Sequence, residues 1–234
     1  MSTANFHNIA QLRFWNEDEL THRDLCQDRI TAQVRNTLSQ VNPAWRFFRM
    51  EGPQLTPRDY LSPEYSDDDI WITPTEIAER QIVLRAETTA STYAFVRENF
   101  THKKLRLPAC FWQVGKSFRR ERTATAAKLR FFEFTQLEMQ CLYSIDTKAD
   151  YRARVLPDLA DTIGWLTRSE ARVVESDRLP AYAQSTMDIE VKFKGKEWRE
   201  MASISIRTDF APDTLNLEVA VGLDRLVEAM MAHP

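Results

Sequence analysis

The chain has 234 residues, and its 34 acidic and 31 basic side chains leave a net charge of −3. Hydrophobic residues make up 43% and charged residues 28%, the balance of a globular domain with a sizeable core. These values exclude a strongly basic protein that coats nucleic acid and an acidic disordered chain. No apolar run approaches the roughly 18 residues of a membrane-spanning helix, and the first residues lack the pattern of a secretory signal.

Cysteine and glycine usage narrows the classes further. The three cysteines lie far apart and form no CxxC pair, so neither a disulfide framework nor a zinc knuckle is expected, and a reducing cytoplasm is the expected compartment. Glycine occurs five times, in neither a GxGxxG nor a GxxxxGK[ST] pattern. If the protein binds a nucleotide, side chains must therefore hold it more than a glycine-lined backbone would.

The first half of the chain predicts helices mixed with short strands. Residues 1–27 are polar with scattered aromatics and predict an N-terminal arm or a surface helix, while 28–234 form the main domain. The spacing of Ile30, Val34, Leu38 and Val41 predicts a helix over 28–41. Next we expect a strand at 45–50, a solvated acidic turn at 66–69, a helical or mixed segment at 74–81, a strand at 82–84 and a helix at 89–100.

The second half predicts long antiparallel strands. Two aromatic-rich runs within 109–143, joined by the polar stretch 119–128, predict a hairpin with a basic tip. A helix at 147–168, a second hairpin at 187–206 and a strand at 215–223 that leads into a helix at 224–231 follow. Antiparallel strands with flanking helices favour an α+β fold, an antiparallel sheet flanked by helices.

Side-chain alternation on the central hairpin sorts two faces. On its second arm the odd positions are mostly apolar and should pack on a core. The polar faces of both arms together would present Arg119, Glu121, Arg130, Phe134 and Glu138. An arginine fork suits phosphate oxygens, a ring suits a base, and a carboxylate suits an amine. Alternation alone also fits a merely solvent-exposed sheet face.

Further strands place acids where an ordinary core would place aliphatic side chains. Glu190 lies beside Asp188, Glu200 shares parity with Ala202, and Glu218 shares a face with Ala220. Buried carboxylates are costly unless they are paired or liganded. These strands therefore add candidate binding residues.

At this point the residues carry a family resemblance. SFRRERTATAAKLRFFEFTQLE resembles motif 2 of class II aminoacyl-tRNA synthetases, with the motif spacing kept by Phe118, Arg119, Glu121, Arg130, Phe134 and Glu138. VGLDRLVEAM resembles motif 3 through Gly222 and Arg225, and residues 28–53 resemble the weaker motif 1. The blocks RAETTASTYAFV, FWQVGKSFRRE, MDIEVKFKGKEWREMASISIRTDF and LNLEVAVGLDR are similar to the dimeric glycyl-tRNA synthetases.

The resemblance implies an ATP site. Arg119 would hold the α-phosphate and the reacting carboxylate, and Glu121 would accept from the adenine amino group. Phe134 would stack on adenine, Arg225 would cover its other face, and Arg130 would belong to the same site. Mg²⁺ would bridge the phosphates, with Glu218 as a ligand.

The resemblance also implies an amino-acid site and a reaction. Glu138, Glu200 and Glu218 would surround the ammonium group, Arg85 and Glu87 would shape the rim, and Ala220 replaces a pocket serine of the family. The expected activity is ATP-dependent formation of an aminoacyl adenylate from a small amino acid, glycine being expected, by in-line attack without a general base. A homodimer is expected. The alternative is a non-catalytic paralogue that serves as a dimeric binding or regulatory module.

The acceptor stays open between a tRNA acceptor end and a carrier protein or metabolite. The chain ends at Pro234 soon after motif 3, so no anticodon-binding domain is expected. A small set of cations would then hold any tRNA, and inefficient tRNA charging is expected. That set is Lys103, Lys104, Arg106, Arg120, Arg122 and Lys128.

Overall fold

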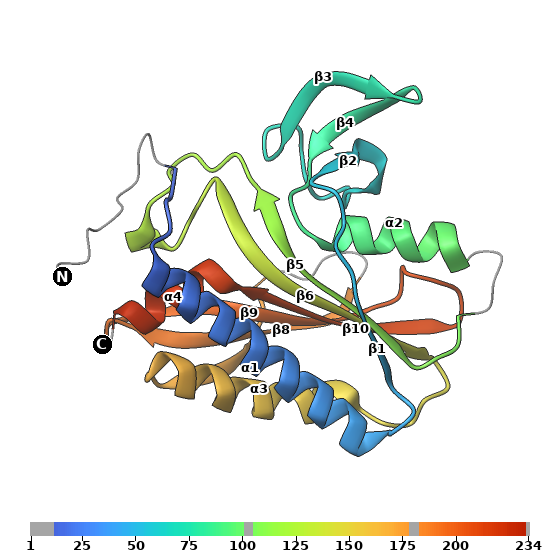
Figure 1. The fold of residues 1–234 in the computed structure, drawn as a ribbon. Helices are drawn as coiled ribbons and strands as arrows, with labels where there is room; N and C mark the ends of the chain where they lie inside the picture. Colours follow the sequence, from blue (N-terminus) through green and yellow to red (C-terminus); the bar gives the residue numbers. More distant parts are fainter. Residues whose placement is uncertain (1–11, 101–104, 178–182, 233–234) are drawn as a thin grey trace.

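A seven-stranded sheet runs through the computed structural model, which describes residues 12–100, 105–177 and 183–232. The strand order is β1-β5-β6-β10-β9-β8-β7 (Figure 1). β1 is parallel to β5, and the other neighbours are antiparallel. The predicted α+β fold and both predicted hairpins are confirmed. The strands are β1 (Arg46–Arg49), β5 (Ala109–Phe118), β6 (Glu133–Ser144), β7 (Ala171–Glu175), β8 (Ala183–Phe193), β9 (Glu197–Arg207) and β10 (Thr214–Gly222).

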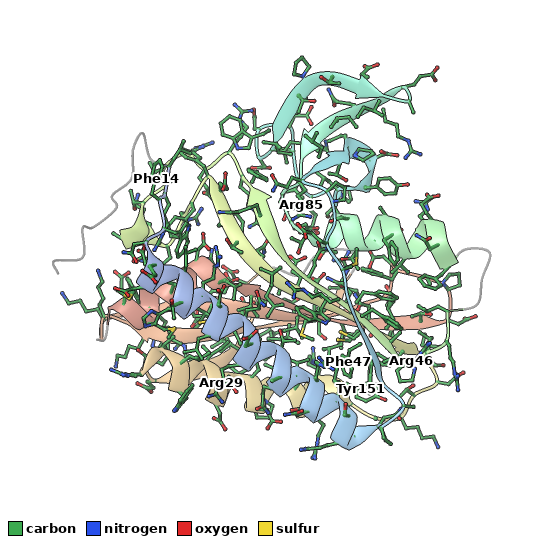
Figure 2. All side chains as sticks on the ribbon, viewed as in Figure 1. Phe14, Arg29, Arg46, Phe47, Arg85 and Tyr151 are labelled. Atoms are coloured by element: carbon green, nitrogen blue, oxygen red, sulfur yellow. The ribbon has the colours of Figure 1, made fainter. Side chains whose placement is uncertain are left out.

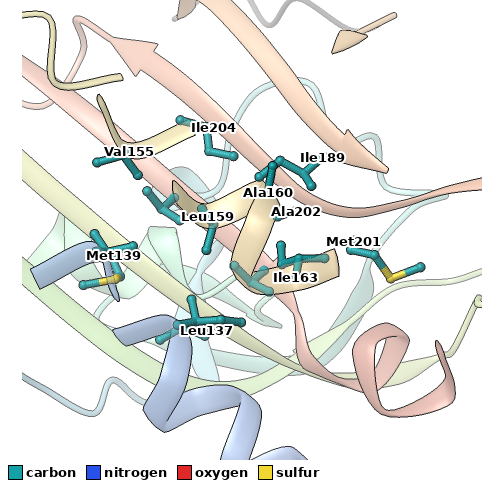
Figure 3. Close-up of a cluster of buried hydrophobic side chains, with 14 of the residues drawn as sticks. Leu137, Met139, Val155, Leu159, Ala160, Ile163, Ile189, Met201, Ala202 and Ile204 are labelled. Atoms are coloured by element: carbon teal, nitrogen blue, oxygen red, sulfur yellow. The ribbon is translucent and has the colours of Figure 1, made fainter. Parts of the chain in front are cut away.

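Three helices cover one face of this sheet (Figure 1): α1 (Glu17–Val41), α3 (Tyr151–Thr167) and α4 (Leu223–Met231). The main core lies between them and the sheet. Leu137 and Met139, odd positions of β6, pack there with Leu159 and Ile163 of α3 (Figure 3). The predicted apolar face of the central hairpin is therefore confirmed. The three cysteines are free and buried, and no helix in the described ranges is long and apolar enough to span a membrane.

α1 begins earlier than the apolar stripe predicted, at Glu17 and not near residue 28. Asn16 and Glu19 form a capping box: the Glu19 amide donates to Asn16 Oδ1 and the Asn16 amide to Glu19 Oε2, both at 2.9 Å. The helix therefore crosses the boundary between the predicted arm 1–27 and domain 28–234, and residues 1–11 lie outside the described part.

The apolar stripe of α1 is used inside the chain. Ile30, Val34 and Leu38 are fully buried in the main core. These side chains are therefore not available to a dimer interface, because packing within the chain already covers them.

The other face of the large sheet carries α2 (Thr89–Phe100) and a three-stranded sheet of order β2-β4-β3 (Figure 1). Its strands are β2 (Leu55–Pro57), β3 (Trp71–Ile77) and β4 (Arg80–Leu84); short 3₁₀ turns lie at Arg58–Tyr60 and Ala126–Lys128. The prediction of a helical or mixed segment at 74–81 is wrong, because these residues form the end of β3, a turn and the start of β4. Ala78 and Glu79 turn the chain there with φ of 51° and 63°. Two-residue hairpin turns with positive φ usually contain asparagine or glycine, and this turn contains neither, so the sequence carries no signal for it.

The core packing generates a stability prediction. Ile163 is fully buried on α3, so Ile163→Ala leaves a cavity and should lower the free energy of unfolding by about 2–5 kcal/mol. Arg154→Ala, at an exposed position of the same helix, should change it by less than about 0.5 kcal/mol. Denaturant titration of both variants checks this, and equal effects would contradict the assigned packing.

Candidate functional site

A cavity of about 810 Å³ opens on the sheet face that carries α2. Its floor follows the strand register: Glu138, Ala220, Ser203 and Asp188 stand side by side on β6, β10, β9 and β8. Side chains in register on one face point the same way, so four strands contribute to a single surface. The polar face is therefore a recessed site and not simply a solvated sheet surface.

The cavity brings together ten of the eleven residues that the sequence singled out. They come from the central hairpin, β9, β10, the start of α4 and the link before α2. These residues are Glu87, Arg119, Glu121, Arg130, Phe134, Glu138, Glu200, Glu218, Ala220 and Arg225.

Arg119 lies at the centre of the motif 2 side chains. Its Nε donates to the Ala86 carbonyl at 3.2 Å and its Nη2 to the Tyr65 hydroxyl at 3.0 Å. Its guanidinium lies 5.2 Å from the centre of the Phe134 ring. Burial alone would lower the pKa of Arg119, but Tyr65 and the nearby carboxylates, Glu87 first among them, raise it above its ordinary value. A permanent cation therefore stands beside an aromatic ring.

The outer part of the site holds two ion pairs. Arg130 Nη1 lies 2.9 Å from Glu121 Oε2. Arg225 Nη1 lies 3.2 Å from Glu200 Oε2, while its Nε donates to the Leu129 carbonyl. Motif 2 and motif 3 side chains thus flank one opening, and the Arg225 contacts tie the start of α4 to the hairpin tip.

The inner part of the site is acidic. Glu138 Oε2 accepts from the hydroxyls of Thr88 and Thr89, each at 2.6 Å. Glu218 Oε2 accepts from Arg207 Nη1 at 2.8 Å and from Gln140 Nε2 at 2.9 Å. These donors offset part of the cost of burying two carboxylates.

Burial raises the pKa of Glu138 to about 7, and the charges of Glu87 and Glu218 add to the rise. Burial likewise raises the pKa of Glu87, followed by the charge of Glu218, while Arg207 and Arg119 oppose the rise. Glu87 and Glu138 therefore resist ionising together in one region of low dielectric, with the Glu218 charge beside them. A cationic ligand would relieve that repulsion.

Arg85 does not line the cavity. It is buried at the junction of the small sheet and β5 (Figure 2). Its Nε donates to the Lys116 carbonyl at 2.7 Å, and its Nη1 to the carbonyls of Gly52 and Pro53 at 2.9 and 3.1 Å. A side chain at Gly115 would overlap the guanidinium. The expectation that Arg85 shapes the rim is wrong, because backbone carbonyls behind the site take its donors.

Glu200 and Ala202 do not share a face, contrary to the parity of the sequence. The β8–β9 register shifts near Glu190, where a bulge interrupts the alternation. Glu200 lines the cavity with Ser203 and Ser205, whereas Ala202 packs in the core. An added residue in a strand cannot be seen from strict period-two alternation.

Two groups of site residues were missed. Asp69 lines the cavity from the run 66–69 that was predicted to be a solvated turn, and Tyr65 lines it from just before that run. Arg207 pairs with both Glu218 and Asp209. The Arg-Thr-Asp-Phe block contained the signal for Arg207, while Tyr65 carried no local signal.

The predicted basic surface is described in part. Lys103 and Lys104 lie outside the described residues. Arg106 is exposed, and Arg120 Nη1 donates to the Asp67 carbonyl at 3.2 Å. Lys128 contacts Thr123 in the tip itself. Arg120 and Lys128 thus use some of their hydrogen-bond donors within the chain.

The donor set around Glu218 does not fit the expected magnesium ligand. Its Oε2 already accepts from Arg207 and Gln140. Within the described ranges, no group of three or more His, Cys, Asp or Glu side chains is placed to hold a metal ion. The carboxylate is committed to an arginine and an amide, which leaves it unsuited to magnesium.

Comparison with known proteins decides the family. The model of the tRNA synthetase class II core domain (G, H, P, S and T) matches residues 73–233. The chain belongs to this family. Two glycine–tRNA ligases are similar: that of Lachnoclostridium phytofermentans is 32% identical over 141 residues, and that of Mycolicibacterium vanbaalenii 30% over 164. The matches cover 58% and 65% of this chain but 30% and 34% of those relatives, so this class II core spans about a third of their length.

Solved structures agree on the fold of this class II core. A cytoplasmic serine–tRNA ligase from Naegleria fowleri in complex with AMP superposes with a TM-score of 0.68, over 92% of this chain and 49% of the other. A Giardia lamblia prolyl-tRNA synthetase in complex with prolyl-adenylate gives 0.65, over 87% and 45%. Both are 15% identical to the chain, which supports the shared fold alone.

The buried carboxylates Glu87, Glu138 and Glu218, called the acidic cluster below, lead to a prediction about pH dependence. The pKa of Glu138 rises from 4.5 to about 7 on folding, so its stabilising contribution is complete below the unfolded pKa and is lost as pH rises through 7. Glu138→Gln keeps an acceptor for the two threonines but removes this loss. The free energy of unfolding should therefore fall from pH 5 to pH 8 in the wild type, and by about 1–3 kcal/mol less in the variant.

Denaturant unfolding at the two pH values checks the prediction. Glu76→Gln, at an exposed position of β3, serves as the matched control and should leave the pH dependence unchanged. An identical pH dependence in wild type and Glu138→Gln would contradict the raised pKa of the buried Glu138 carboxyl group.

Proposed function

We propose that this class II core joins ATP and a small amino acid, expected to be glycine, into an aminoacyl adenylate. The supporting observation is a single cavity in which Arg119 lies between Phe134 and the acidic cluster. A ring, a fixed cation and buried carboxylates match the three charge types of the reactants: a base, phosphate and carboxylate oxygens, and an ammonium group. Membership of the family and the glycine–tRNA ligase relatives support the same activity.

The chemistry follows from placement. An amino-acid carboxylate oxygen attacks the α-phosphorus, a new oxygen–phosphorus bond forms, and the bond to pyrophosphate breaks. Arg119 stabilises the negative charge on the α-phosphate, Phe134 stacks on the base, and Arg225 offers a second cation to the leaving pyrophosphate. No residue must accept a proton, because the carboxylate is already ionised. Positioning and electrostatics therefore carry the step.

The acidic cluster would bind the ammonium end. A cation near Glu138 stabilises its ionised form, which burial disfavours in the empty site. The floor at Ala220 adds little bulk. The cluster thus favours a small zwitterion over a neutral or anionic compound.

The acceptor belongs to the proposal as well. The glycine–tRNA ligase relatives favour the acceptor end of a tRNA, and a carrier protein is the second acceptor to test. Adenylate formed with the best amino acid is offered to total tRNA and to purified carrier proteins in parallel. Transfer to tRNA supports the first acceptor, and transfer to a carrier protein alone would replace it.

The role of Arg119 yields the first functional prediction. Arg119→Ala removes a charge that acts on the transition state and should lower amino-acid-dependent exchange of pyrophosphate into ATP by at least about 100-fold. Arg154→Ala, exposed on the opposite side of the sheet, should retain wild-type exchange. Unchanged exchange in Arg119→Ala would refute the assignment, and no exchange by wild type with any of the twenty amino acids would favour a non-catalytic module.

We also propose that the protein is a two-fold homodimer, as the motif 1 resemblance implies. β1 is an edge strand of the described sheet with Phe48 exposed, whereas the α1 stripe is buried. Light scattering at micromolar concentration should give twice the mass of one chain. A monomer mass would count against the dimer.

A further inference from the structure

The acidic segment 61–70 is a fixed wall of the cavity. It links the 3₁₀ turn at Arg58–Tyr60 to β3, and its two ends, Leu61 and Ile70, are buried. Both pack in a small apolar cluster with residues of β4 and α2, and Tyr65 lies partly buried against this cluster. The segment is therefore anchored on both sides of Tyr65.

Polar contacts hold the same segment in shape. Arg58 Nη2 donates to the Tyr65 carbonyl at 2.5 Å. Asp69 Oδ2 accepts from the amide and hydroxyl of Ser66 at 3.0 and 2.6 Å. The Arg120 amide donates to the Asp69 carbonyl at 2.9 Å, which joins the segment to the motif 2 arm. The run 66–69 is thus the exposed turn that was predicted, and the backbone and Tyr65 beside it are docked on the site.

The Tyr65 hydroxyl joins two charged groups of the site. It donates to Glu87 Oε2 at 2.8 Å and accepts from Arg119 Nη2 at 3.0 Å. Its single proton and an oxygen lone pair are both used in these contacts. The same two groups face the two ends of an amino acid if Arg119 meets the carboxylate and the ammonium group lies in the acidic region that Glu87 shares with Glu138 and Glu218.

We propose that Tyr65 is a specificity-determining residue, and that its ring limits the side chain of the amino acid to a very small group. This inference rests on the proposed function. A ligand that spans Arg119 and Glu87 lies along the Tyr65 hydroxyl, so a group on its α-carbon toward segment 61–70 meets the phenol.

The middle of the floor sets little limit. Ala220 and Ser203, which lie there on β10 and β9, are small. The anchored Tyr65 supplies a rigid bulky side chain beside Arg119 and Glu87. Pockets that discriminate by one methylene do so by about 10–200-fold.

The test measures equilibrium binding, so it does not depend on turnover. The probes are the glycyl, alanyl and valyl forms of 5′-O-sulfamoyl adenosine, stable mimics of the adenylate, titrated by calorimetry. Wild type should bind the glycyl form at least about 10-fold more tightly than the alanyl form, and the valyl form most weakly.

Three variants separate ring from hydroxyl. Tyr65→Ala should reduce the glycyl-to-alanyl gap at least about 10-fold, and Tyr65→Leu, with an intermediate volume, should reduce it partly. Tyr65→Phe should keep the gap while weakening all three probes by a similar factor of about 2–12. Tyr60→Phe is the matched control, because its hydroxyl bonds Glu98 at the exposed surface; it should bind as wild type does.

Each outcome decides a claim. An unchanged gap in folded Tyr65→Ala, or in Tyr65→Leu should the alanine variant not fold, overturns the role of Tyr65 and leaves the proposed function standing. If Tyr65→Phe and Tyr65→Ala lose the preference for the glycyl over the alanyl probe equally, the claim that the ring sets the size limit is overturned. Failure of wild type to bind any probe overturns the proposed function itself.

Discussion

Three carboxylates that share one poorly solvated cavity set the constraint on the rest of this structure. Burial raises the pKa of Glu87 and of Glu138, and the charge of Glu218 beside them adds to both rises. Arg207 and Arg119 supply the positive charge, and threonine hydroxyls supply donors. These arginines and threonines come from the end of β9, the residue after β5 and the start of α2. The site therefore forms only when these elements are brought together.

The helix-covered face of the sheet secures that register. Odd positions of β6 are sealed against α1 and α3, and a slip of β6 by one residue would move Glu138 into the apolar core. Behind the site, Arg85 ties β5 to the carbonyls of the loop at 52–53. A buried cation that takes no part in lining the cavity thus keeps the motif 2 strand and the link carrying Glu87 in place.

Sequence alone predicted what is local or spaced by motif. Period-two alternation placed Phe134 and Glu138 on one face of the hairpin and Glu218 with Ala220 on a face of its own strand, and the motif resemblance put Arg119 and Arg225 in one site. It failed where tertiary contacts decide. The bulge in β9 moved Ala202 into the core, and Tyr65 gains meaning only because the segment that carries it folds back onto Arg119.

The charge balance of the empty cavity points to the kind of ligand that completes it. Asp209 already engages Arg207, so this arginine is shared between two acids and the cluster retains excess negative charge. Arg119 keeps its charge in every state and lies one hydroxyl away from Glu87. An ammonium group would offset the excess negative charge of the carboxylates, and a carboxylate would pair with Arg119. A molecule that bears both within the reach of one phenol oxygen is a short zwitterion, which is the substrate class proposed above.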